Sequence, residues 1–153
     1  MVRTRSRCRG RHRSRVIPPV HPHSFNHPRP RPAPSAFTGS SVSGEPVNYR
    51  FERLTLVVAI KPSCDGCRDF VFSPLDELRH VAIVLVSASA EVNGEWSGAS
   101  RPIIVAPQLA ATLDLRWPPC YVLVDPEAGH VVTEGVVFGP SQVALEIAPY
   151  LRL

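Results

Sequence analysis

The chain has 153 residues and a formal net charge of +4, and 44% of its residues are hydrophobic. This length is enough for one domain with a sizeable core. The sequence contains no run of about 18 apolar residues, so stable insertion into a membrane is not expected. The arginine-rich N-terminus lacks the apolar stretch of a secretory signal, which favours a cytoplasmic location.

The N-terminal part of the chain differs sharply in composition from the rest. Residues 1–46 hold nine arginines and one acid, about +8, whereas residues 47–153 carry about −4. The alternating arginines and the Pro-rich stretch that follows them cannot form a core. We therefore expect a disordered basic tail over residues 1–46 and one folded domain over residues 47–153. A tether to an anionic surface is the alternative, but without interleaved aromatic residues no nucleic-acid partner is expected.

The folded part begins with a pattern typical of a parallel sheet. Residues 54–60, "LTLVVAI", form a continuous apolar run, as expected of a strand covered on both faces. Residues 64–80 predict a helix that is broken near Ser73, because Pro74 follows it. Residues 81–87, "VAIVLVS", predict a second buried strand. A strand–helix–strand unit of this length forms a right-handed parallel crossover.

The second half predicts more strands and helices. A polar loop over residues 88–101 leads into a short apolar stretch and a short helix opened by Pro107. A strand, its hairpin partner and a last helix follow; their expected ranges are 120–125, 131–138 and 139–151. The fold class is therefore α/β, with a central mixed sheet flanked by helices.

Two cysteines, Cys64 and Cys67, lie where the first predicted strand meets the first predicted helix. A structural zinc site needs four ligands, and His80 and His130 are isolated, so no metal is expected. A redox pair has a physical basis here, because the N-terminus of a helix stabilises a thiolate. The alternative is that both cysteines only pack the start of the helix.

A second motif lies about fifty residues downstream, in "RWPPCYVLVDPEAGHVV". With it, the chain resembles the thioredoxin-like superfamily, and most closely its TlpA-like branch of thiol–disulfide oxidoreductases. The resemblance covers about residues 47–152. It rests on "LTLVVAI" leading into "CDGCR", on "VAIVLVS", on "LAATLDLRWPPCYVLVDPEAGHVV" and on a last helix ending "IAPYL".

The resemblance implies a thioredoxin-like fold and a thiol–disulfide oxidoreductase, with Cys64 as nucleophile and Cys67 as resolving cysteine. It also implies that Pro119 is cis and lies beside the pair, where the Pro118 backbone would bind an extended peptide. Trp117 is a candidate for lining this groove. The expected partners are protein or small-molecule thiols and disulfides and an upstream redox partner. No cofactor is expected, and the protein is expected to be a monomer.

The chain departs from the family pattern in several places. Ser63 precedes the pair where an aromatic residue is usual, and Asp65 and Gly66 lie between the cysteines where a proline is usual. Val58 occupies the position of a buried acid that assists proton transfer. These departures favour the alternative function, a non-catalytic thioredoxin-fold binding or scaffold module.

Lys61, Ser63 and Asp65 are expected to modulate the pair. Lys61 and Arg68 favour the Cys64 thiolate, whereas Asp65 opposes it. We expect a moderately lowered thiol pKa and hence a reducing or mild exchanger. Family members usually face outward from a membrane, so an extracytoplasmic location is the alternative to a cytoplasmic one.

Two further residues have two interpretations each. Cys120, directly after the expected cis-proline, is either a third, resolving thiol or a buried strand residue. Trp96, in the polar loop, either caps that loop or packs into the core.

Overall fold

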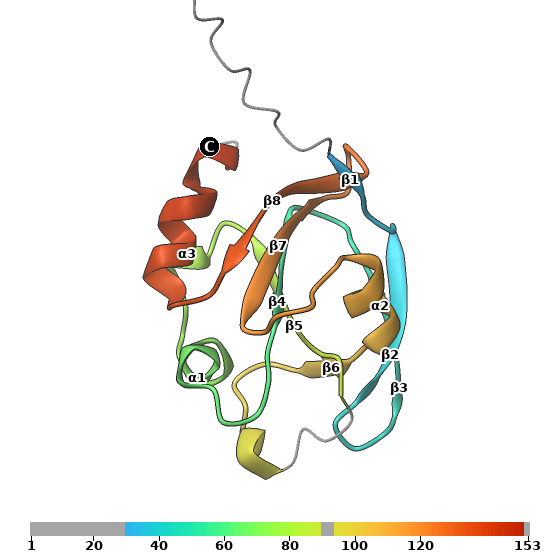
Figure 1. The fold of residues 1–153 in the computed structure, drawn as a ribbon, viewed down its shortest axis with the longest axis vertical. Helices are drawn as coiled ribbons and strands as arrows, with labels where there is room; N and C mark the ends of the chain where they lie inside the picture. The colour runs from blue at the N-terminus through green and yellow to red at the C-terminus, as the bar shows by residue number, and fades with distance from the viewer. Residues whose placement is uncertain (1–29, 90–93, 152–153) are drawn as a thin grey trace, which may run out of the picture.

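The computed structural model describes residues 30–89 and 94–151. Their strands form one mixed sheet of eight strands in the order β1-β8-β7-β4-β5-β6-β2-β3 (Figure 1). The strands are β1 (Arg31–Pro32), β2 (Ala36–Ser41), β3 (Pro46–Arg50), β4 (Thr55–Ala59), β5 (Ala82–Ser87), β6 (Ile103–Val105), β7 (Cys120–Asp125) and β8 (His130–Val136).

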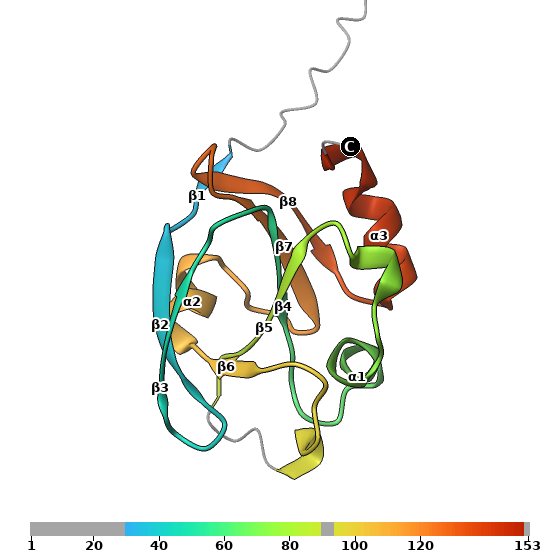
Figure 2. The same cartoon turned by 180° about the vertical axis from the view of Figure 1, so that it is seen from behind.

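Helices cover both faces of this sheet. Figures 1 and 2 show α1 and α3 on one side and α2 with the β2–β3 hairpin on the other. The α-helices are α1 (Asp65–Phe72), α2 (Pro107–Thr112) and α3 (Pro140–Ile147), and the 3₁₀ turns are η1 (Asp76–Leu78), η2 (Gly94–Trp96) and η3 (Ala148–Tyr150). In the described ranges no helix has the length and apolar character needed to cross a membrane.

The centre of the sheet agrees with the predicted crossover. β4 pairs in parallel with β5, and β5 with β6, whereas β7 pairs antiparallel with β4. β7 and β8 form the predicted hairpin. The helix expected over residues 64–80 is broken as predicted, since α1 ends at Phe72 and only the single turn η1 follows Ser73.

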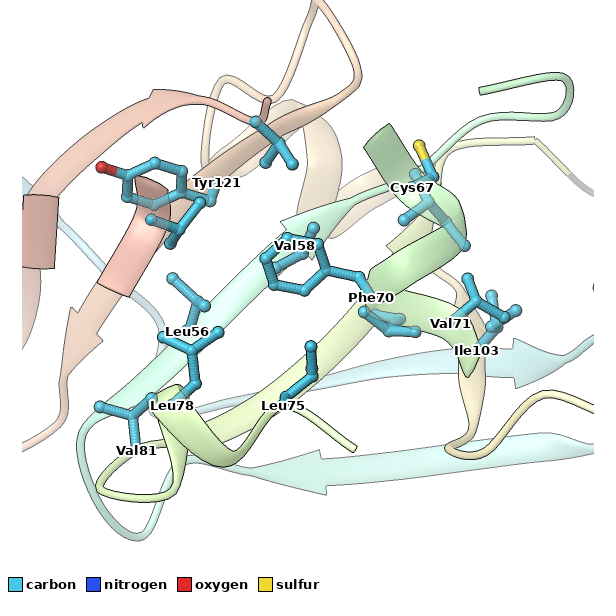
Figure 3. Packing of buried hydrophobic residues seen from close by; sticks show 14 of the residues in the cluster. Leu56, Val58, Cys67, Phe70, Val71, Leu75, Leu78, Val81, Ile103 and Tyr121 are labelled. Atoms are coloured by element: carbon cyan, nitrogen blue, oxygen red, sulfur yellow. The ribbon is translucent and has the colours of Figure 1, made fainter. Parts of the chain in front are cut away.

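Successive residues of the central strands enter two separate cores, because side chains alternate between the faces of a strand. Figure 3 shows the core beneath α1, where Leu56 and Val58 of β4 lie near Phe70 of the helix. We call this the α1-side core; it includes Leu56, Val58, Ile60, Cys64, Cys67, Phe70, Leu85, Trp96, Tyr121, Leu123, Val143 and Ile147. The α2-side core includes Phe37, Phe51, Val57, Ala59, Val84, Val86, Leu109, Ala110, Leu113, Val122 and Val124.

The predicted boundary at residue 46 is wrong, because the sheet already includes residues 31–32 and 36–41. β2 pairs with both β3 and β6, and Phe37 packs against Tyr49 and Phe51 with ring centroids 5.4 and 5.7 Å away. In β2, "AFTGSS", only the first two residues are apolar, so this edge hairpin has no strong apolar alternation. The disorder predicted for residues 1–29 lies outside the described residues.

Candidate redox site

The motif "CDGC" lies at the junction of β4 and α1. Cys64 is the N-cap of α1 with extended backbone angles, and its sulfur accepts a hydrogen bond from the Cys67 N–H at 3.2 Å. The Cys64 carbonyl accepts from the N–H groups of Cys67 and Arg68. The sulfur thus occupies the place of a capping oxygen, at the positive end of the helix dipole.

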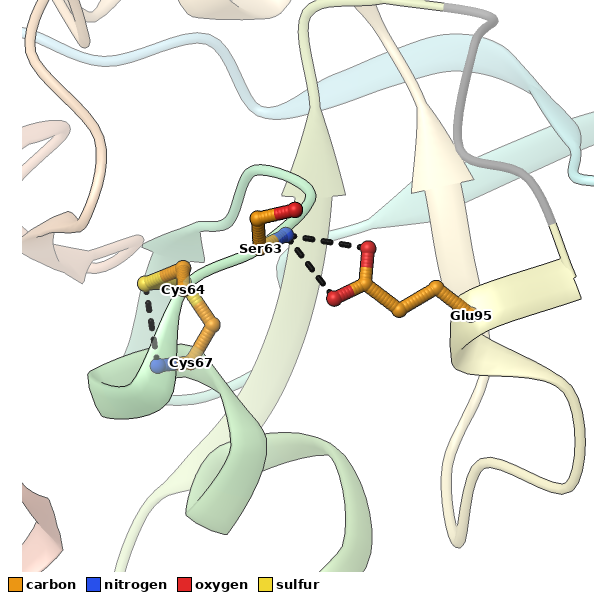
Figure 4. Close-up of a disulfide and its surroundings, with 4 residues drawn as sticks. All are labelled: Ser63, Cys64, Cys67 and Glu95. Atoms are coloured by element: carbon orange, nitrogen blue, oxygen red, sulfur yellow. Dashed lines mark hydrogen bonds between the residues drawn. A yellow bond between two sulfur atoms is a disulfide. The ribbon is translucent and has the colours of Figure 1, made fainter.

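A disulfide joins Cys64 to Cys67, whose Cα atoms are 5.3 Å apart (Figure 4). Cys64 is 7% exposed, whereas Cys67 is completely buried in the α1-side core. Both residues are buried, but only Cys64 keeps an exposed area. This asymmetry supports the predicted roles of the two cysteines.

The loop before β7 contacts the motif. The Pro118–Pro119 peptide bond is cis, which confirms the prediction from the family resemblance. A Cβ placed on Gly66 would lie 3.9 Å from Pro119 Cγ and 3.3 Å from the Val137 carbonyl oxygen. Pro119 therefore lies beside the motif, as predicted, and Gly66 leaves room for this close approach.

The two loops that meet Gly66 each carry an exposed apolar side chain. Trp117 is 83% exposed and Phe138 is 79% exposed. Trp117, Val136 and Cys120 line a surface hollow of about 260 Å³, and the Phe138 carbonyl lies near Gly66. Sequence analysis missed Phe138. Its only sign in the sequence is that the consecutive apolar residues "VVF" end the alternation of β8.

Cys120 occupies a different environment from the pair. It is half-buried in β7 opposite Ala59 and packs against the α2-side core, across the sheet from the disulfide. Burial raises the pKa of the Cys120 thiol, and a backbone hydrogen bond with Trp117 acts in the opposite direction. These contacts support the packing interpretation and contradict a role as an extra resolving thiol.

Of the three residues expected to modulate the pair, Ser63 has a specific contact. Its N–H donates to both carboxylate oxygens of Glu95, at 2.8 and 2.9 Å (Figure 4). Lys61 and Asp65 are exposed on either side of Cys64 along the chain. Glu95 was not predicted, because a contact across 32 positions leaves no local pattern in the sequence.

The neighbourhood of the pair is otherwise apolar. Val58 faces the α1-side core beneath α1, so a hydrocarbon occupies the position where the family places an acid. Trp96 is 4% exposed and packs against Phe72, which makes it a core residue. Across residues 30–89 and 94–151, no three His, Cys, Asp or Glu side chains are grouped to hold a metal.

No family model and no curated protein matches the sequence. The structure is similar to the pneumococcal exposed lipoprotein thioredoxin Etrx1 of Streptococcus pneumoniae, with 17% identity and a TM-score of 0.56 over 76% of this chain and 99% of that one. A thioredoxin-family thiol:disulfide interchange protein of Chlorobium tepidum has 18% identity and a TM-score of 0.54, covering 80% and 97%. The thioredoxin domain of a Bacteroides vulgatus thiol-disulfide oxidoreductase has 18% identity and a TM-score of 0.56, covering 79% and 96%.

The chain therefore has a thioredoxin-like fold, with a C-x-x-C pair at the start of its first α-helix. Its structural neighbours include a thioredoxin-family thiol:disulfide interchange protein and the thioredoxin domain of a thiol-disulfide oxidoreductase. At these identities the likeness concerns the fold.

Proposed function

We propose that the protein is a thiol–disulfide oxidoreductase that works through Cys64 and Cys67. The observation that carries this proposal is the asymmetry of the pair at the start of α1. Cys64 caps the helix and keeps a small exposed area, whereas Cys67 is completely buried. A structural disulfide has no need of a sulfur that caps a helix N-terminus, whereas disulfide exchange uses the thiolate stabilisation that this position provides.

In the reducing direction, the Cys64 thiolate attacks one sulfur of a substrate disulfide. The new S–S bond forms as the substrate bond breaks, and the other substrate sulfur leaves as a thiolate that takes up a proton. The Cys67 thiolate then attacks Cys64 Sγ and releases the second substrate thiol. The substrate has gained two electrons, the Cys64–Cys67 disulfide has formed, and an upstream dithiol must reduce it again.

The surface around the pair suits protein substrates with exposed apolar segments. Trp117 and Phe138 project from the two loops that meet the motif at Gly66. We propose that Trp117, Pro118 and Pro119 bind the chain on either side of the substrate cysteine. Small thiols and disulfides remain possible substrates, because they need only Cys64.

Reduction of insulin disulfides by dithiothreitol tests the proposed function. Cys64→Ser removes the nucleophile, and we expect it to lower the catalysed rate by about 100-fold or more. Wild type that is no faster than Cys64→Ser would contradict the proposal. That result would favour the second candidate, a non-catalytic thioredoxin-fold module, which the Val58 hydrocarbon at the family's acid position supports.

A cytoplasmic location and a monomeric state stay predictions. The neighbour from Streptococcus pneumoniae is an exposed lipoprotein, which supports the extracytoplasmic alternative. The mass of the native N-terminal peptide would distinguish a processed from an unprocessed chain, and light scattering would give the oligomeric state.

A further inference from the structure

One segment, residues 94–101, contacts both ends of α1, the helix that carries the redox pair. At the C-terminal end its side chains and backbone bind carbonyl groups that a helix leaves without partners. Ser100 donates to the Val71 and Phe72 carbonyls at 2.9 Å each, and Arg101 donates to those of Phe70 and Ser73. At the N-terminal end the same segment contributes Glu95.

The Glu95 contact falls on the residue directly before Cys64. Ser63 has a φ of +56°, in the left-handed region that non-glycine residues rarely adopt. Its N–H points between the two carboxylate oxygens, which accept at 2.8 and 2.9 Å. The carboxylate therefore holds the loop in the conformation from which Cys64 enters the helix.

The position of Glu95 is itself fixed by packing. Its neighbour Trp96 is buried in the α1-side core and packs against Phe72, with ring centroids 6.1 Å apart. Phe72 also lies beneath the Arg68 guanidinium, 5.4 Å from the ring centroid. Figure 4 shows Glu95 and the disulfide on different sides of Ser63, so Glu95 acts on Cys64 through Ser63 and not by contact with the sulfur.

We propose that Glu95 is a positioning residue for Cys64. It fixes Ser63 and with it the direction of the Cys64 sulfur, and its negative charge opposes the Cys64 thiolate. The charged groups next to the reduced pair are then Lys61 and Arg68, which favour the thiolate, and Asp65 and Glu95, which oppose it.

The redox consequence rests on the proposed function. Destabilising the Cys64 thiolate destabilises the reduced form of the pair, so the Cys64–Cys67 couple becomes a stronger reductant. Glu95 thus biases the enzyme towards reducing its substrates, with a dithiol as the electron donor. A neutral side chain at this position would make the Cys64–Cys67 couple a stronger oxidant.

Three variants separate geometry from charge. Glu95→Gln keeps an acceptor oxygen for the Ser63 N–H and removes the charge. Glu95→Ala removes both, and Glu52→Gln neutralises an exposed acid just before β4, at the opposite end of that strand from Cys64. Circular dichroism first confirms that each variant is folded.

The test is the pH dependence of iodoacetamide alkylation at Cys64 in the reduced proteins, followed by peptide mass spectrometry. We expect Glu95→Gln to lower the Cys64 pKa by about half a unit, as loss of a nearby like charge does. We expect Glu95→Ala to lower that pKa as well and to slow exchange with oxidised glutathione at pH values where Cys64 is fully ionised. Glu52→Gln should match wild type.

Unchanged Cys64 pKa values in both Glu95 variants would overturn the inference. Because alkylation needs no turnover, this result is separate from the insulin assay. An inactive wild type in the insulin assay would contradict the proposed function. An active wild type whose Cys64 pKa is the same as in both Glu95 variants would contradict only the role of Glu95.

Discussion

The two faces of the sheet hold cysteines in contrasting environments. On the α1 side, Cys64 caps a helix and forms a disulfide with Cys67. On the α2 side, Cys120 lies within a strand, packs against apolar side chains and has a raised thiol pKa because of burial.

This difference shows that the place of a cysteine in the fold decides its chemistry. The end of β4 delivers Cys64 to the N-terminus of α1, where backbone N–H groups favour a thiolate. Strand alternation turns Cys120 to the opposite face from its neighbour Tyr121. The predictions below test this contrast, from the largest expected effect to the smallest.

The largest effect is expected from substitutions of single cysteines. Cys67→Ala removes the resolving thiol, so the mixed disulfide at Cys64 accumulates and insulin turnover falls by about 100-fold or more. Cys120→Ser, on the other face, should leave turnover unchanged. Non-reducing gels detect the trapped mixed disulfide, and peptide mapping identifies the cysteine that forms it. A mixed disulfide at Cys120 would contradict the contrast between the two faces.

Truncations in the two cores should destabilise the fold but differ in their effect on the redox pair. Phe70→Ala removes a fully buried ring beneath α1, and we expect it to lower the free energy of unfolding by about 3–5 kcal/mol. Leu109→Ala, in the α2-side core, should cost about 2–5 kcal/mol. Urea denaturation measures both.

At equal fractions folded, only Phe70→Ala should change the equilibrium of the Cys64–Cys67 pair with glutathione, because Phe70 belongs to the helix that carries it. Equal shifts in the two variants would show that the pair responds to overall stability and not to α1.

The exposed apolar residues beside the motif should affect substrate binding. Trp117→Ala or Phe138→Ala should each raise KM for unfolded, disulfide-containing protein substrates by about fivefold, the effect of losing about 1 kcal/mol of apolar contact. Leu145→Ala is a matched control, because Leu145 is 77% exposed on α3. Steady-state kinetics measures KM; an equal increase for Leu145→Ala would argue against a specific docking surface.

The smallest effect concerns Tyr121, the neighbour of Cys120 on the α1 face. Its buried hydroxyl donates to Glu146 at 2.5 Å, which lowers the pKa of that carboxyl, with a smaller contribution from Gln142. Tyr121→Phe should lower the free energy of unfolding by about 1 kcal/mol at pH 7. Because the folded-state pKa of Glu146 is lowered, this stabilisation is present above the ordinary carboxyl pKa.

The difference between Tyr121→Phe and wild type should therefore shrink as the pH falls through the lowered pKa of Glu146. Urea denaturation at pH 7 and at pH 3 measures it. A difference independent of pH would mean that the hydroxyl contributes by packing alone.

Local patterns predicted most of the central fold. The apolar run of β4, the break near Ser73 and the hairpin after Asp125 each leave a signal within a few residues. The cis state of Pro119 and its place beside the motif came from the family resemblance, and the structure confirms both.

The features that sequence analysis missed depend on contacts between distant segments. β1 and β2 lie in a stretch whose arginines and prolines suggest a tail, yet Arg31 donates to the Leu113 carbonyl at 3.0 Å and forms an ion pair with Glu134. Glu95 reaches Ser63 across a polar loop, and Phe138 meets the motif only through folding. None of these pairings has a sequence spacing that marks it.

The most direct test of the central claim is a redox titration of the wild-type protein in glutathione buffers. Free thiols are alkylated at each ratio and identified by peptide mass spectrometry. We predict that Cys64 and Cys67 lose alkylation together in one two-electron transition, while Cys120 stays alkylated throughout. A disulfide that includes Cys120, or a Cys64 and a Cys67 that oxidise independently, would contradict the account.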